Sequence, residues 1–236
     1  MRAAVEKHYR LVVFDWDGTL IDSIGSIVSC TEAALAAAGV AVPPAAVLRG
    51  AIGLGLTDSF ERFHPGLSAE TRERILDRYR HHWVETWHSR HDPFPATAAT
   101  LARLADAGTQ LAVATAKSRR GIVRDFERTG LGGYFAATRT LDECPPKPSP
   151  AMLLEIMAEL GAGPHETLMI GDTRWDLEMA ANAGVDGVAV LCGAQPEEEL
   201  RACRQLACLP EVGALPAWLG LAAGAPGRPG APAIAT

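Results

Sequence analysis

Residues 10–19 of the chain read RLVVFDWDGT, a short apolar run that ends in an acidic, glycine-containing turn. An uninterrupted run of branched apolar residues is typical of a strand buried on both faces of a sheet. Gly18 allows the backbone of the turn to approach a ligand closely. The segment therefore predicts a buried strand whose carboxyl end delivers two carboxylates, Asp15 and Asp17, into a tight loop.

Beyond residue 92 the sequence alternates between strand patterns and helix patterns. Apolar runs predict strands at residues 110–114, 135–138, 167–170 and 185–191. Helical spacing predicts helices at residues 96–107, 119–128, 150–160 and 176–183. This alternation is typical of a doubly wound parallel sheet, so we expect an α/β fold of the Rossmann-like kind.

Between the first strand and this alternating region lies a segment with helical patterns alone. Residues 24–38, 56–63 and 69–87 carry apolar side chains at helical spacing, and no strong strand pattern interrupts them. The simplest architecture is an α/β core with an inserted all-helical cap. We expect the core at residues 1–22 and 93–222, the cap at residues 23–92, and a disordered Pro/Gly/Ala-rich tail at residues 223–236.

Composition limits the possible partners. The chain has 236 residues, of which 48% are hydrophobic, so it can bury a core. Its net charge of -6 argues against nucleic acid or an anionic membrane as the main partner, but not against a small anion. No apolar run is long enough to span a bilayer and the N-terminus lacks a signal-peptide pattern, so we expect a cytoplasmic protein. Five irregularly spaced cysteines predict free thiols.

Four loops place polar side chains after predicted strands or directly before a predicted helix. These side chains are Asp15, Asp17, Thr115, Lys117, Lys147, Asp172 and Asp176. In an open α/β sheet, ligands bind beyond the carboxyl ends of the strands. Phosphoryl transfer needs a nucleophile, neutralised phosphate oxygens and a positioned acid or base, and this set can supply all of them.

Residue chemistry divides this set into two tasks. Carboxylates such as Asp15, Asp172 and Asp176 are the protein ligands that Mg²⁺ prefers, and we therefore expect Mg²⁺ as the cofactor. The ammonium of Lys147 and the hydroxyl of Thr115 can hold the phosphate oxygens of a substrate. Asp176 could instead cap the helix that it opens, or do both.

Four short motifs, in order, resemble those of the haloacid dehalogenase superfamily. They are DWDGT at residues 15–19, ATAK at residues 114–117, KPSP at residues 147–150 and GDTRWD at residues 171–176. The resemblance covers about residues 10–193, and the cap between the first two motifs is similar to that of the phosphoglycolate phosphatase branch. Trp16 stands where a smaller apolar residue is common, and Ala116 where Asn is frequent.

The resemblance implies a role for each motif residue. Asp15 would be the nucleophile and Asp17 the general acid and base. Thr115, the backbone N–H of Ala116 and Lys147 would bind phosphate. The metal would be held by the Asp15 carboxylate, the Asp17 carbonyl and Asp172, with Asp176 beside it.

The cap supplies a further set of candidates. In the resembled family the segment that corresponds to RGAIGLGL, residues 49–56, faces the active site. This makes Ile52, Gly53 and Leu54 candidate substrate contacts. A plain turn between two helices is the alternative reading of the same residues.

The resulting hypothesis is a Mg²⁺-dependent phosphatase that forms an aspartyl-phosphate and acts on a small phosphorylated metabolite. The resemblance favours 2-phosphoglycolate as substrate. The alternatives are a sugar phosphomutase of the same superfamily and a non-enzymatic phospho-acceptor or binding module. Asp17 argues against a dehalogenase, and the lack of any lysine in residues 24–91 argues against a Schiff-base phosphonate hydrolase. Monomer and homodimer both stay open.

Overall fold

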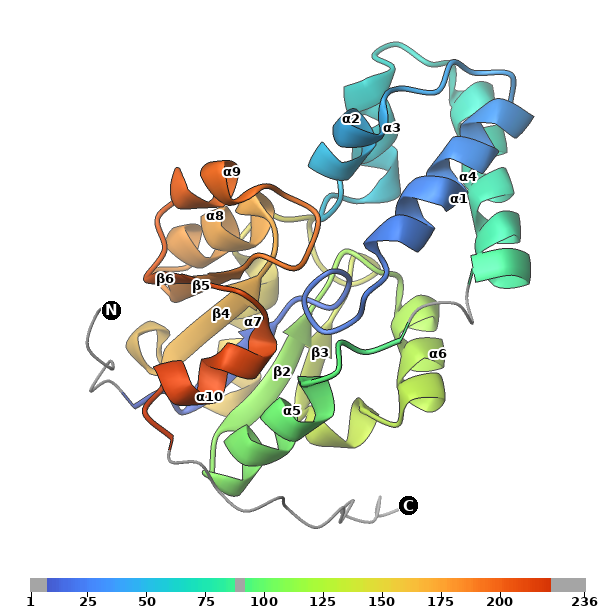
Figure 1. Ribbon diagram of the computed structural model, residues 1–236. Helices are drawn as coiled ribbons and strands as arrows, with labels where there is room; N and C mark the ends of the chain where they lie inside the picture. Colours follow the sequence, from blue (N-terminus) through green and yellow to red (C-terminus); the bar gives the residue numbers. More distant parts are fainter. Residues whose placement is uncertain (1–7, 88–91, 222–236) are drawn as a thin grey trace.

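The computed structural model describes residues 8–87 and 92–221, and its centre is a six-stranded sheet (Figure 1). The strands are β1 (Leu11–Phe14), β2 (Gln110–Ala114), β3 (Ala137–Arg139), β4 (Thr167–Gly171), β5 (Asp186–Val190) and β6 (Ala207–Leu209). All five neighbouring pairs are parallel, and the order is β3-β2-β1-β4-β5-β6. The order reverses beside β1, so the predicted doubly wound α/β fold is confirmed.

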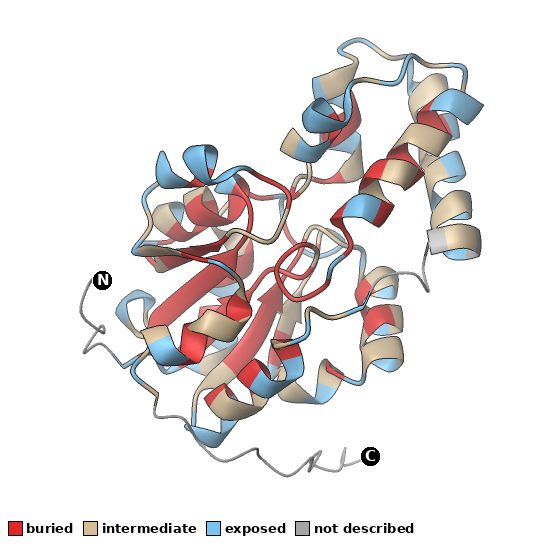
Figure 2. Cartoon of the chain, viewed as in Figure 1, coloured by how far each residue is buried: buried red, intermediate tan, exposed pale blue. Residues whose placement is uncertain are grey.

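Helices cover both faces of this sheet. They are α5 (Thr97–Asp106), α6 (Arg119–Thr129), α7 (Ala151–Leu160), α8 (Arg174–Asn182), α9 (Glu197–Arg201) and α10 (Leu215–Trp218). Alternate side chains of β1 point to opposite faces. Val12 and Phe14 pack in one apolar cluster with α5, α6 and α10, whereas Leu11 and Val13 pack in another with α7 and α8. Figure 2 shows that the central strands are buried along their length.

A group of helices is inserted between β1 and β2, and we call it the helical insertion. It contains α1 (Ile24–Ala37), α2 (Ala45–Gly50), α3 (Leu56–Phe63), α4 (Ala69–His82) and the π-helical turn η1 (Trp83–Trp87). It has its own apolar cluster, which includes Leu35, Phe60 and Ile75. In Figure 1 it stands apart from the helices that flank the sheet. The predicted domain limits at residues 22/23 and 92/93 stay a prediction, and the predicted disordered tail lies outside the described residues.

Several elements differ from those predicted. The strand predicted at residues 135–138 begins at Ala137, because the backbone N–H of Phe135 donates instead to the carbonyl of Gly132 in the preceding turn. The helix predicted over residues 69–87 changes to a π-helical turn at Trp83. The short elements α2, α9, α10 and β6 had no recognisable pattern. Three 3₁₀ turns complete the described part: Gly132–Tyr134, Pro164–Glu166 and Val212–Ala214.

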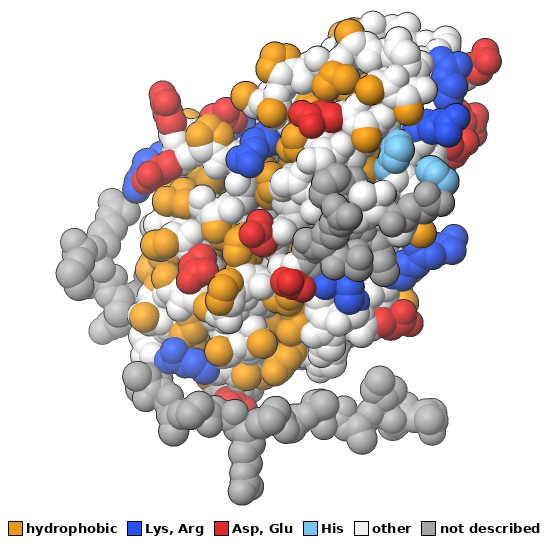
Figure 3. Space-filling model, turned by 45° about the vertical axis from the view of Figure 1, so that its right-hand side comes forward, with side chains coloured by type: hydrophobic (Ala, Val, Ile, Leu, Met, Phe, Trp, Pro, Cys, Tyr) orange, Lys and Arg blue, Asp and Glu red, His pale blue; other side chains and the backbone are white. Residues whose placement is uncertain are grey.

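Three further features of the described residues concern membrane helices, cysteines and surface charge. None of the helices in residues 8–87 and 92–221 is long and apolar enough to cross a membrane. All five cysteines lie in the described residues and are free thiols, as predicted. On the face drawn in Figure 3, acidic and basic side chains are interspersed rather than gathered by sign.

Candidate active site

The central strand β1 delivers Asp15 to the carboxyl edge of the sheet. Phe14 is paired with Val113 of β2 on one side and with Ile170 of β4 on the other. The backbone N–H of Asp15 donates to the carbonyl of Ile170 at 2.9 Å. The loops after β2 and β4 therefore start beside Asp15, as parallel strands require. In Figure 1 the loop that follows β1 lies between the sheet and the helical insertion.

Lys147 joins two of the predicted carboxylates. Its Nζ lies 2.8 Å from Oδ1 of Asp15 and 2.6 Å from Oδ1 of Asp176. All three side chains are buried, and Lys147 exposes only 1% of its surface. A lysine is rarely buried unless its charge is compensated, so this placement is not that of a surface residue.

The two carboxylates after β4 are held by separate donors. Asp172 accepts from the Thr19 hydroxyl at 2.9 Å and from the Ala194 N–H at 2.7 Å. Asp176 accepts from the Thr173 N–H at 3.1 Å and from its hydroxyl at 2.7 Å, the arrangement of a helix cap at the start of α8. Asp176 therefore does cap its helix, and it also contacts Lys147.

Backbone approaches Asp172 closely from two sides. A Cβ built on Gly18 or on Gly193 would overlap the carboxylate of Asp172. Gly18 also has a φ of +81°, which disfavours any residue with a side chain. These two glycines leave room for Asp172 and little else.

The donor set suits a divalent cation. Asp15, Asp172 and Asp176 each offer a carboxylate oxygen, and these oxygens lie within 4.8 Å of one another. Three buried carboxylates and the Lys147 ammonium leave a formal charge of -2, which is costly in a buried site unless a cation compensates it. Oxygen ligands of this kind are those that Mg²⁺ uses.

The pKa values of these groups reflect the same charge excess. Burial raises the pKa of Asp15 to about 7, against the opposing effect of the Lys147 ammonium. Burial, with repulsion from Asp15 and Asp176, raises the pKa of Asp172 well above its usual range. A bound cation would favour the ionised form of each carboxylate.

Asp17 lies in the same loop as Asp15, but its carboxylate contacts different side chains. Its Oδ1 accepts from the Ser23 hydroxyl at 2.7 Å, and its Oδ2 lies 3.1 Å from Nζ of Lys117. Asp15 and Asp17 thus each pair with a different lysine, Lys147 and Lys117. The two carboxylates therefore lie in different surroundings. Two carboxylates with different chemical roles need such a difference.

The loop after β2 holds the predicted phosphate-binding residues. Thr115 is buried, and its backbone N–H donates to the carbonyl of Arg139 at 3.0 Å. Its hydroxyl accepts from the N–H of Lys117 at 3.2 Å, which shapes the turn around the half-buried Ala116. The turn places Thr115 one residue beyond the end of β2.

The loop between α2 and α3 reaches the core. A Cβ on Gly53, whose φ is +95°, would lie 2.8 Å from the Thr173 hydroxyl and 2.9 Å from Cδ1 of Trp175. Gln195 Nε2 donates to the carbonyl of Gly50 at 3.5 Å. The predicted contact residues Ile52, Gly53 and Leu54 therefore belong to a loop that lies against the start of α8.

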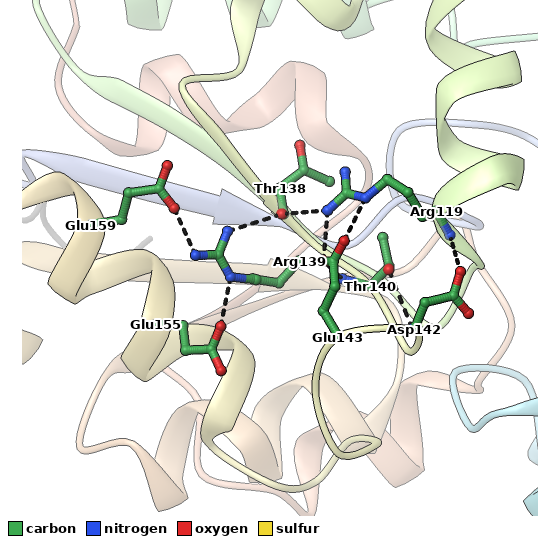
Figure 4. Close-up of polar contacts among 8 residues, drawn as sticks. All are labelled: Arg119, Thr138, Arg139, Thr140, Asp142, Glu143, Glu155 and Glu159. Atoms are coloured by element: carbon green, nitrogen blue, oxygen red, sulfur yellow. Dashed lines mark hydrogen bonds and ion pairs between the residues drawn. The ribbon is translucent and has the colours of Figure 1, made fainter.

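Ion pairs fix the segment that leads from β3 to Lys147 (Figure 4). Arg119 contacts Glu143 through two nitrogens at 2.6 Å, and it donates from its Nη2 to the carbonyl of Thr138 at 2.8 Å. Arg139 contacts Glu155 and Glu159 of α7 at 2.8 and 2.7 Å. The guanidinium of Arg119 is therefore occupied by contacts that hold this edge of the sheet.

Sequence reasoning missed several residues around Asp17. Lys117 was placed at the sheet edge but given no role, and its partner Asp125 and the Asp17 donor Ser23 were not considered. One signal was available for Asp125, because it lies three residues after Ile122 on the buried face of α6. A carboxylate at a buried helical position usually has a partner.

Comparison with known proteins places the chain in a family. Residues 12–190 match the model of the family described as haloacid dehalogenase-like hydrolase. A phosphoglycolate phosphatase of Mesorhizobium japonicum is 31% identical over 185 residues, which are 76% of this chain and 82% of that protein. A protein of Dickeya dadantii named probable phosphatase IndB is 35% identical over 199 residues, 81% of this chain and 85% of its own length.

Solved structures agree with this match. A predicted phosphatase from Clostridium acetobutylicum superposes with a TM-score of 0.79 at 26% identity, over 89% of this chain and 97% of that one. A hydrolase from Pseudomonas syringae superposes with a TM-score of 0.80 at 23% identity, over 87% of this chain and 95% of its own, which shows the shared fold.

Proposed function

The chain belongs to the haloacid dehalogenase-like hydrolase family and is a phosphatase of that family, and from this premise we propose that it hydrolyses a small phosphomonoester through an aspartyl-phosphate on Asp15. The observation that carries the proposal is the buried group of Asp15, Asp172, Asp176 and Lys147 at the carboxyl edge of the sheet. Such a group supplies a nucleophile and compensating positive charge at one place.

Asp15 is the proposed nucleophile. Its carboxylate attacks phosphorus, the bond from phosphorus to the leaving oxygen breaks, and the phosphoryl group becomes attached to Asp15. Lys147, 2.8 Å from Asp15, lies where it can meet the negative charge on the transferred group. Thr115 and the backbone N–H of Ala116 are the further proposed phosphate contacts.

Asp17 is the proposed acid and base. It gives a proton to the leaving oxygen in the first step. In the second step it takes a proton from a water whose oxygen attacks phosphorus, the bond from phosphorus to Asp15 breaks, and inorganic phosphate is released. The separate surroundings of Asp15 and Asp17 support this division of roles, because Asp17 does not share Lys147. Its hydroxyl donor Ser23 and its ammonium partner Lys117 both favour a fixed orientation.

Mg²⁺ is the proposed cofactor, held by the carboxylates of Asp15 and Asp172 and by the backbone carbonyl of Asp17, with Asp176 beside it. When bound, it would neutralise charge between the nucleophile and the phosphate. The formal charge of -2 on the buried group supports a divalent cation there. The capping contacts of Asp176 support a position for this residue beside the metal as well as a role in orienting Lys147.

The helical insertion is the proposed cap over the substrate. Ile52, Gly53 and Leu54 would contact the part of the substrate that leaves, and the close approach of Gly53 to Thr173 supports this arrangement. A cap that covers the site would exclude bulk water during phosphoryl transfer.

The proposed substrate is 2-phosphoglycolate, the compound in the names of several relatives. A relative of similar identity is named only as a probable phosphatase, so the test must compare substrates. Initial rates with Mg²⁺ on 2-phosphoglycolate, sugar phosphates and nucleoside monophosphates should give the highest kcat/KM for 2-phosphoglycolate, with release of inorganic phosphate. A higher kcat/KM for another compound would contradict 2-phosphoglycolate as the substrate. Isomerisation of a sugar phosphate without release of phosphate would contradict hydrolysis.

A further inference from the structure

The carboxylate of Asp17 is fixed at both oxygens by donors from different parts of the chain. Ser23, just before α1, donates to Oδ1 at 2.7 Å. Lys117, in the loop after β2, lies 3.1 Å from Oδ2. A carboxylate whose two oxygens are both held cannot rotate freely about the bond from Cβ to Cγ. The orientation of the Asp17 carboxylate therefore depends on the position of Lys117.

Lys117 is in turn held by α6. Its Nζ lies 3.3 Å from Oδ2 of Asp125, a residue with 1% of its surface exposed. A Cβ on Gly121, one turn before Asp125, would lie 2.8 Å from Cγ of Lys117. The missing side chain at Gly121 leaves the space through which the lysine stem reaches Asp125 and Asp17.

The chain of contacts returns, through Trp16, to the loop that follows β1 and carries Asp15 and Asp17. The indole Nε1 of Trp16 donates to Oδ2 of Asp125 at 2.8 Å. The ring is fully buried and makes edge contacts with Phe126 and Phe135, at centroid distances of 5.2 and 6.1 Å. Since Trp16 and Asp17 are adjacent in sequence, the residues Trp16, Asp125, Lys117 and Asp17 form a closed set of contacts, which we call the Asp17 network.

The Asp17 network also meets the helical insertion. Nζ of Lys117 lies 4.9 Å from the ring centroid of Trp83 in η1. Cation–π contacts of this kind are strongest where water is excluded, and the Lys117 side chain is only 10% exposed. With two carboxylates already beside it, Lys117 is poorly placed to bind an anionic substrate.

We propose that Trp16, Asp125 and Lys117 are positioning residues that hold the carboxylate of Asp17 in the direction needed for proton transfer. The inference rests on the proposed function, because it takes Asp17 as the general acid and base. It assigns a purpose to the tryptophan at position 16 and to a buried carboxylate in the middle of α6. A purely structural network would instead support the fold and leave the two chemical steps equally affected.

The two steps can be separated with p-nitrophenyl phosphate and Mg²⁺. Nitrophenolate leaves without needing a proton, so the first step, seen as a burst, should tolerate a misdirected Asp17. The second step needs Asp17 as a base, so the steady-state rate should fall. For Asp125→Asn and for Trp16→Phe we expect a steady-state rate roughly tenfold or more below wild type, a part of the 10²–10⁴-fold that acid–base catalysis contributes. The burst rate should stay within about threefold, and phosphorylated protein should accumulate.

Tyr9→Phe is the matched control. Like Trp16→Phe it removes one donor from a buried ring to an aspartate, here the 2.9 Å contact of Tyr9 with Asp186, but it lies before β1, at the opposite end of that strand from Asp15. Its two rates should stay in the wild-type ratio even if its melting temperature falls. Asp125→Asn keeps the size of the side chain and an acceptor for Trp16, so it still decides the question if Trp16→Phe fails to fold.

Asp17→Asn separates this inference from the proposed function. If Asp17→Asn shows a burst and slow turnover while Asp125→Asn and Trp16→Phe keep the wild-type ratio of rates, the network only supports the fold and the inference is overturned. Burst and steady-state rates that fall together would overturn it equally. If Asp17→Asn itself turns over at the wild-type rate, the proposed acid–base role fails, and the inference falls with it.

Discussion

At the scale of single residues, Lys147 is the cation whose removal should lower activity strongly. It is the cation within contact distance of both Asp15 and Asp176, and it lies where negative charge would gather during transfer. Lys147→Ala should lower kcat/KM by roughly 10²–10³-fold, the cost of losing one group that stabilises a developing charge. Lys147→Arg should restore a small part of the activity, because a planar fork does not replace a point charge.

Arg174→Ala gives the comparison for Lys147→Ala. Arg174 is an exposed cation two residues from Asp176, and its ion pair with Glu178 lies on the surface. Its loss should leave kcat/KM unchanged within about twofold. Near-normal activity of a folded Lys147→Ala protein would show that Lys147 is not part of the catalytic site.

A second residue-scale prediction concerns pH and Mg²⁺. Burial raises the pKa of Asp15 from 3.8 to about 7. Between about pH 4 and pH 7 the carboxyl group is therefore ionised in the unfolded chain and protonated in the folded protein, so the stability of the fold decreases as pH rises through this range. A cation bound to the ionised carboxylates offsets this loss. The increase in melting temperature on adding Mg²⁺ should therefore be small near pH 5 and several degrees larger near pH 8.

Melting curves at matched ionic strength, with NaCl in place of MgCl₂, measure this increase. Asp172→Asn should lose most of it, because that change removes one of the carboxylates from the group. A Mg²⁺ effect that is equal at both pH values, or larger at pH 5, would contradict a buried carboxylate site.

Sequence reasoning at this scale succeeded where a residue belongs to a short motif. Asp15, Asp172, Asp176 and Lys147 were all placed at one sheet edge, and the structure brings them together. The contacts around Asp17 were missed because they pass through Lys117 to Asp125, and no sequence motif links Lys117 to this residue of α6. Contacts between side chains on different elements depend on packing, which local sequence patterns do not contain.

At the scale of elements, the loop between α2 and α3 is the contact between the helical insertion and the core that is easiest to test. Gly53 has a positive φ and lies too close to Thr173 and Trp175 for a side chain. Gly53→Ala should push this loop away from α8 and lower kcat/KM by roughly tenfold, because small displacements in positioning groups are costly.

Gly66→Ala is the matched control within the same insertion. Gly66 has a φ of +84°, near the +95° of Gly53, but a Cβ there would meet nothing within 4 Å. Both variants should lose a similar stability of about 1–2 kcal/mol from the left-handed backbone. Equal effects on kcat/KM in the two variants would show that the loop has no role in substrate binding.

Elements were predictable where their apolar pattern is long. The four longer strands and the helices α1, α5, α6 and α7 agree with the periodicity of the sequence. The strand β6 has three residues, of which two are half-buried, so its pattern is too short to recognise. The π-helical turn after α4 was unpredictable for a different reason, because its five residues are too few for an apolar pattern to distinguish a π-helix from an α-helix.

At the scale of the whole molecule, the order of the strands explains the site. Parallel strands with β1 between β2 and β4 bring the loops after all three to one edge, and that edge faces the helical insertion (Figure 1). The alternation of strands and helices predicted this fold, because the rules for connecting parallel strands allow only a few topologies. The cost of burying three carboxylates there is offset by one lysine and, in our proposal, by Mg²⁺.

The central claim is that Asp15 carries the phosphoryl group and Asp17 moves the proton. An amide is a poor nucleophile, so Asp15→Asn should form no phosphoenzyme. Asp17→Asn should still react slowly with p-nitrophenyl phosphate, whose leaving group needs little protonation, and should then retain the phosphate for lack of a base.

Mass spectrometry of the quenched Asp17→Asn protein, after reaction with p-nitrophenyl phosphate and Mg²⁺, tests this claim most directly. The account predicts one added phosphate, on the peptide that contains Asp15, and none in the double variant Asp15→Asn with Asp17→Asn. Phosphate on any other residue, or efficient turnover by Asp15→Asn alone, would contradict it.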